Sequence, residues 1–136
     1  MQPVHEERFY HEGRGPELRR AHWSAHGTSL RAIDYFNPDV PHTPDHLSHV
    51  RFIRPQVVAI TPEEVIDYRA LGDGLVRYRP AALFDLGRSA WLESFNPHHL
   101  VRCRHYQLFF YDQLFDVICE GLECHAGGYT EAAQAG

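Results

Sequence analysis

The sequence predicts a mainly β domain, an antiparallel sheet or sandwich with a C-terminal β-hairpin over residues 102–124 and one or two short helices. Short segments rich in β-branched and aromatic residues alternate with turn signals that contain proline and glycine. Helix-start signals are few. The last third of the chain contains two apolar runs on either side of Asp112-Gln113, which is the pattern of a hairpin. An α+β sheet with a helix on one face is the alternative.

The N-terminal part of the chain begins with a polar segment. Residues 1–17 include Gly13, Gly15 and Pro16, so we expect a loose arm with at most a short strand over residues 8–10. Residues 18–27 show no clear preference. Residues 28–36 are β-branched and aromatic and predict a strand, whereas the three prolines of residues 37–44 predict a loop.

The middle of the chain predicts further short elements. Residues 50–60 predict a strand that Pro55 interrupts, which indicates an edge strand or a bulge. The run Thr61-Pro62-Glu63-Glu64 is typical of a helix start, so we expect a short helix to about residue 68, with a strand over residues 65–68 as the alternative. We expect a turn at residues 72–74, strands at 75–79 and 82–86, and a helical turn at 89–95. Residues 126–136 are expected to form the frayed tail of a single domain, residues 1–136.

The hairpin is predicted to have one apolar and one mixed face. A turn over residues 111–114 pairs Phe110 with Phe115 and Leu108 with Val117, and cross-strand partners share a face. The apolar face then consists of Tyr106, Leu108, Phe110, Phe115, Val117 and Cys119. The mixed face consists of Cys103, His105, Gln107, Phe109, Asp116, Ile118, Glu120 and Leu122. In this register His105 lies opposite Glu120.

Composition excludes several classes of function. All thirteen basic residues are arginine, as in proteins from GC-rich bacterial genomes, so a lysine Schiff base and a P-loop lysine are excluded. The net charge of −5, with no basic block beyond Arg19-Arg20, predicts no nucleic-acid partner. No apolar run reaches the roughly 20 residues that span a bilayer, so no membrane partner is expected. With three cysteines and no signal-peptide core, we expect reduced thiols in a cytoplasmic protein.

Two groups of residues suggest a metal site. A helical turn starting at Pro44 would place His46 and His49 one turn apart beside Asp45, a set that could bind zinc or another divalent cation. A second set would combine His98-His99, Cys103 and His105 with Cys124-His125 at the open end of the hairpin. Water-facing loop histidines and buried cysteines are the ordinary explanations of both patterns, so no cofactor is expected, with zinc as the alternative.

The mixed face of the hairpin is the remaining candidate site. A histidine beside a carboxylate can act as a general base, which makes His105 and Glu120 the catalytic candidates, and Asp116 is a second carboxylate on the same face, so that the pair could hold a proton or a cation. The apolar residues of the same face indicate a second packing layer, a ligand pocket or a subunit interface, the last through Gln107, Phe109, Ile118 and Leu122.

No nucleophile elbow, P-loop, dinucleotide fingerprint, HExxH or CxxC motif occurs in the sequence. We therefore expect a non-catalytic module that binds a protein partner or associates with itself, for example as a homodimer. The alternative is a small metal- or histidine-dependent enzyme, or a ligand-binding β-sandwich or barrel.

Overall fold

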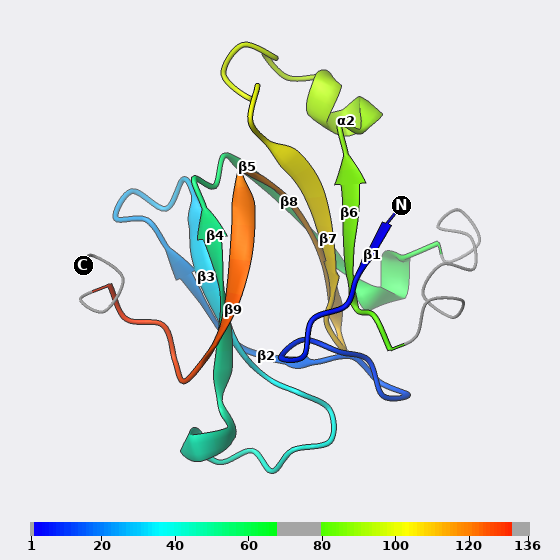
Figure 1. The fold of residues 1–136 in the computed structure, drawn as a ribbon, viewed down its shortest axis with the longest axis vertical. Helices are drawn as coiled ribbons and strands as arrows, with labels where there is room; N and C mark the ends of the chain where they lie inside the picture. The colour runs from blue at the N-terminus through cyan, green and yellow to red at the C-terminus, as the bar shows by residue number, and fades with distance from the viewer. Residues whose placement is uncertain (1, 68–79, 132–136) are drawn as a thin grey trace.

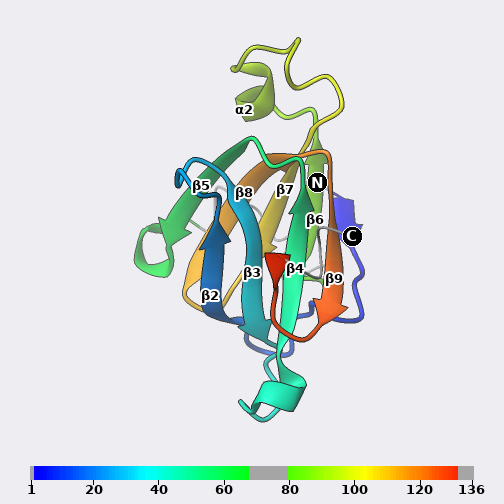
Figure 2. The ribbon, with the colours of Figure 1, turned by 90° about the vertical axis from the view of Figure 1, so that its left-hand side faces the viewer.

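The chain forms two antiparallel β-sheets (Figures 1 and 2), as the sequence predicts. The structure is a computed structural model and describes residues 2–67 and 80–131. The first sheet has the order β1 (Gln2–Val4), β6 (Leu83–Gly87), β7 (Arg104–Phe109), β8 (Gln113–Cys119), β5 (Val57–Pro62). The second sheet has the order β2 (Glu17–Trp23), β3 (Leu30–Phe36), β4 (Ser48–Ile53), β9 (Gly121–Ala126).

The main core lies between the two sheets and follows the two-residue period of the strands. In β3, Ile33 and Tyr35 point into this core, and β4 contributes Val50 and Phe52. The first sheet contributes the apolar hairpin face, including Leu108, Phe110, Phe115, Val117 and Cys119. The alternation of apolar residues therefore decided which face of each strand is buried.

The hairpin of β7 and β8 keeps its predicted faces but not its predicted register. Leu108 lies opposite Phe115 rather than Val117, which is a shift of two residues. The chain reverses more tightly than expected, because the Phe110 amide donates to the Gln113 carbonyl at 2.9 Å and leaves a two-residue turn. A shift of two residues preserves the faces because side chains alternate with a period of two.

The second hairpin strand ends at Cys119, so the predicted hairpin boundary at residue 124 is wrong. Residues 121–126 cross to the second sheet as β9, and β4 crosses in the same way to become β5. The two crossings lie side by side: the Glu120 amide donates to Ile53 and the Gln56 amide to Ile118, each at 2.8 Å. The interruption predicted at Pro55 is thus a change of sheet, which follows the left-handed backbone of Arg54 at φ 49°.

The N-terminal segment is not a loose arm. β1 pairs with β6, and Phe9 is fully buried in the main core against Tyr35 and Phe110. The Tyr35 hydroxyl and the Asn37 amide both donate to the Arg8 carbonyl. The ambiguous residues 18–27 supply most of β2, and the predicted strands at 28–36 and 82–86 appear as β3 and β6.

The helical elements are short. Ser89 caps α2 (Ala90–Glu93), in agreement with the predicted helical turn. The helix expected after Thr61 is only a single 3-10 turn, η2 (Glu63–Val65), because Thr61 and Pro62 still belong to β5. The turn and strand predicted over residues 72–79 lie outside the described residues. Over residues 2–67 and 80–131, no helix is both long and apolar enough to cross a membrane.

Candidate functional site

The mixed face of the hairpin holds His105 in a chain of three polar side chains. The Ser89 hydroxyl lies 2.8 Å from His105 Nδ1, and Asp116 Oδ1 lies 2.6 Å from His105 Nε2. The His105 side chain is only 6% exposed, whereas that of Asp116 is 16% exposed. The Asp116 carboxylate accepts a hydrogen bond from the Nε2–H group of His105. Nδ1 therefore keeps a lone pair and accepts a hydrogen bond from the Ser89 hydroxyl.

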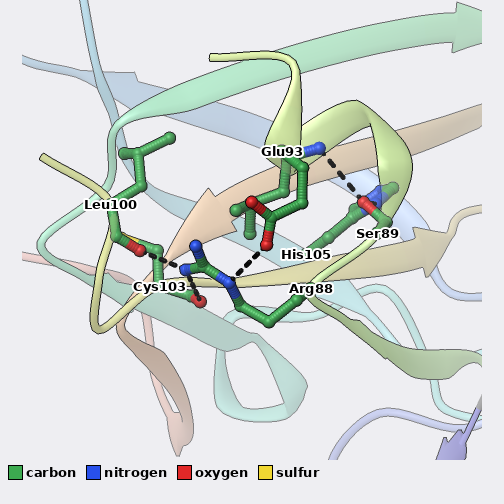
Figure 3. Close-up of polar contacts among 7 residues, drawn as sticks. Arg88, Ser89, Glu93, Leu100, Cys103 and His105 are labelled. Carbon is green, nitrogen blue, oxygen red and sulfur yellow. Dashed lines mark hydrogen bonds and ion pairs between the residues drawn. The ribbon is translucent and has the colours of Figure 1, made fainter. Parts of the chain in front are cut away.

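The segment between β6 and β7, residues 88–103, forms an excursion from the first sheet and positions this Ser89-His105-Asp116 relay. Ser89 follows β6 and begins α2, where its oxygen also accepts the Leu92 amide at 3.2 Å. The Trp91 ring packs edge-on against His105, with 4.9 Å between ring centroids. Figure 3 shows Ser89 and His105 pointing toward one another beneath this excursion. The hydroxyl therefore serves both as a helix cap and as the partner of a buried imidazole.

Arg88 holds the two ends of the same excursion together (Figure 3). Its guanidinium donates to the carbonyls of Leu100 and Cys103 and pairs with Glu93 at 2.9 Å. Two backbone carbonyls at the end of this excursion therefore accept hydrogen bonds from an arginine at its start. Leu92, Leu100 and Cys103 pack beneath this contact on Ile118.

The predicted pairing of His105 with Glu120 is wrong. The register shift places His105 opposite Ile118, and Asp116 takes the position from which a carboxylate reaches the ring. Glu120 follows the last residue of β8, where Oε2 pairs with Arg54 Nε at 3.0 Å.

The residues predicted to form a subunit interface lie within the packing of the chain itself. Phe109 packs with Phe84 and Leu114, and Ile118 packs beneath the excursion after β6. Gln107 is 6% exposed, and Leu122 lies on β9, where it packs against the main core. Of the three explanations offered for the mixed face, a second packing layer describes this arrangement.

The structure does not assemble the predicted metal set. The turn η1 (Pro44–His46) exists, but it ends at His46, and His49 lies on strand β4. His46 and Asp45 are both exposed and share the Thr43 hydroxyl, at 2.9 and 2.6 Å. Cys103 and Cys124 pack in different clusters. Within residues 2–67 and 80–131, no group of three or more histidine, cysteine or acidic side chains is arranged to hold a metal ion.

A row of polar side chains that the sequence did not suggest crosses the outer face of the second sheet. Asp34, His49 and His125 lie directly opposite one another on β3, β4 and β9. His22 Nε2 of β2 lies 2.9 Å from Asp34 Oδ2. The available signal was Asp34 between apolar residues of β3, since a charge at such a position is rarely buried without partners.

The segment after β9 covers this row. The Tyr129 amide donates to Asp34 Oδ1 at 2.9 Å, and His49 Nδ1 donates to the Gly127 carbonyl at 2.8 Å. Tyr129 also packs its ring against His22 and His49. The first residues of the expected frayed tail are therefore held on the sheet, and residues 132–136 lie outside the described residues.

Burial sets the chemistry of the three thiols. All three cysteines are free, and desolvation raises the pKa of Cys119 and of Cys124 to about 12. Burial also raises the pKa of Cys103. Since thiolates are the reactive form, a raised pKa lowers the reactivity of these groups near neutral pH.

The outer edge of β5 is the most exposed apolar element of the first sheet. β5 ends the order of that sheet, so one edge of its backbone has no neighbouring strand in the part of the chain that is described. Its residues Val57–Pro62 carry no charge, and Ile60 is 46% exposed. Such an edge is a template for pairing with another chain.

Comparisons with known protein families, with curated proteins and with solved structures find no match to this chain. The class that the fold and these sites define is an antiparallel two-sheet β domain with a partly buried Ser-His-Asp relay and an uncharged edge strand that has no outer neighbour among the described residues.

Proposed function

We propose that this protein is a non-catalytic module that binds protein by strand addition at the outer edge of β5. In this mode an extended segment of another chain adds to the sheet, and backbone hydrogen bonds supply much of the affinity. The proposal includes a cytoplasmic location, because three free thiols suit a reducing compartment.

The observation that carries the proposal is the uncharged edge of β5. Natural sheets protect an open edge with charged side chains, bulges or covering loops. β5 instead presents Val-Val-Ala-Ile-Thr, closed only by Pro62 at its end. The edge of the other sheet at β2 carries Arg19 and Arg20, which are exposed, and its pairing is interrupted by irregularities. The contrast favours β5 as the binding edge.

A peptide titration tests strand addition directly. The probe is a synthetic peptide with the sequence of residues 56–62, added to isotope-labelled protein. We expect the amides of Val58 and Ile60, which point away from β8, to shift and to exchange hydrogen more slowly. Ala59 and Thr61, whose amides already pair with β8, are the internal controls. Exchange at Val58 and Ile60 that stays as fast as in an unpaired strand, both without peptide and at millimolar peptide, would overturn the proposal.

A second candidate function follows from the relay itself. Ser89, His105 and Asp116 have the contacts by which a histidine activates a serine nucleophile for acyl transfer. A fluorophosphonate probe that labels Ser89, and no longer does so in His105→Gln, would support a hydrolase. Absence of labelling in the folded protein would leave the relay as a helix cap.

A further inference from the structure

We infer that the strand added to β5 is β5 of a second copy, paired antiparallel about a two-fold axis at Ala59. This inference rests on the proposed function and names its partner. The result is a homodimer in which the two first sheets join into one continuous sheet. Three features of β5 support it: the direction of its backbone groups, the register that satisfies them, and the charges at the ends of the strand.

The pairing of β5 with β8 fixes which backbone groups point outward. The Glu63 amide donates to the Asp112 carbonyl at 2.8 Å, and the register continues with Thr61 opposite Leu114 and Ala59 opposite Asp116. In an antiparallel ladder the bonded residues alternate, so Ala59 and Thr61 bond to β8 while Val58 and Ile60 direct their N–H and C=O groups outward. Pro62 is the next outward position, where a missing amide costs nothing to the ladder.

One register satisfies both outward residues. If Val58 lies opposite the partner's Ile60, each of these residues both donates to and accepts from the facing residue, and Ala59 lies opposite the partner's Ala59. A register that pairs Val58 with the partner's Pro62 leaves the Val58 carbonyl without a donor, because proline has no amide.

The same register also covers exposed apolar surface. Residues directly opposite one another share a face, so Ile60, 46% exposed, packs on the partner's Val58 at both ends of the pair. Ile60 and Val58 lie on the inner face, since their β8 neighbours Phe115 and Val117 are core residues. The added strand therefore continues the first sheet beyond β5, which lies at the left-hand margin of the view in Figure 2.

The charges that flank β5 are complementary in this arrangement. Arg54 precedes the strand and Glu64 follows it, and both are exposed. Antiparallel pairing about Ala59 brings the N-terminal end of β5 in one copy beside the C-terminal end of β5 in the other, so at each end an arginine lies near a glutamate. The Arg54 side chain is 74% exposed even with its own Glu120 as partner, so it can face a second carboxylate. A parallel pair would instead bring like charges together.

Disulfide trapping tests the two-fold register. Under mild oxidation Ala59→Cys should give a covalent dimer, because two residues at a non-hydrogen-bonded antiparallel site can form a disulfide. Val65→Cys, at a position that is 65% exposed but off the axis, is the matched control and should form no covalent dimer, nor should the wild type with its shielded thiols. An Ala59→Cys protein that forms no covalent dimer under oxidation would overturn the inference.

Sedimentation equilibrium supplies the non-covalent test. We expect wild type to dimerise at micromolar concentration and Ile60→Lys to be monomeric, because a charge on the edge opposes pairing. Arg54→Glu or Glu64→Arg should each weaken the dimer about two- to fivefold, and the double exchange should restore it. If the peptide of residues 56–62 binds β5 while whole chains stay monomeric, the inference fails and the proposed function stands; if neither binds, both fail.

Discussion

Replacing Ser89 with alanine tests whether the relay is a structural brace. The hydroxyl accepts the Leu92 amide as the cap of α2 and donates to His105. Loss of a serine cap costs about 1 kcal/mol, and loss of one net hydrogen bond costs about 1 kcal/mol more. The expected loss is therefore about 2 kcal/mol of the free energy of unfolding. A domain of 136 residues should then melt about 7 °C lower.

Thermal unfolding followed by circular dichroism measures this loss. Ser94→Ala is the matched control, because Ser94 belongs to the same excursion but is exposed and its hydroxyl only donates to the Trp91 carbonyl. Ser89→Thr should recover most of the loss, since threonine retains the capping oxygen. A Ser89→Ala protein that melts within about 2 °C of the Ser94→Ala protein would refute the two-bond assignment of this hydroxyl.

Three further predictions follow from burial. Phe9→Ala should cost about 3–5 kcal/mol in urea unfolding, whereas a cost below about 1 kcal/mol would contradict the docking of the N-terminal segment. Phe109→Arg should unfold the chain in circular dichroism rather than yield a folded monomer, because Phe109 is buried within the chain, and a folded variant would contradict this. The raised pKa values of Cys119 and Cys124 mean that their protonated forms stabilise the fold fully below about pH 9, and that this contribution is lost as pH rises toward about 12. Urea titrations over this range should show a steeper decline than for Cys119→Ala, and equal slopes would contradict the burial of that thiol.

The faces of the hairpin were predictable, whereas its polar contacts were not. Alternation assigned Leu108 and Val117 to the core face whatever the register, because a two-residue shift preserves the faces. The partner of His105 depends on the register itself, and that was set by a two-residue turn at Tyr111-Asp112 for which the sequence carries no favoured turn signal. A shift of two residues was enough to replace Glu120 by Asp116.

Ser89 was identified as part of a helical turn, but not as a partner of His105. The two residues are sixteen positions apart, and their contact depends on how the excursion between β6 and β7 folds back over the sheet. Likewise, the row from His22 to His125 requires the order of β2, β3, β4 and β9. No local pattern contains the order of strands that are distant in sequence.

The sequence by itself determined the β class, the strands over residues 28–36 and 82–86, the helical turn that begins at Ser89 and the inward face of each hairpin strand. These properties are local, since they depend on residue type and on the two-residue period of a strand. The tertiary structure alone decided that the chain changes sheets beside Pro55, that Phe9 is a core residue, and that β5 lies at an open edge. Each of these depends on contacts between segments far apart in the chain, whose free energy comes from joint burial rather than from local preference.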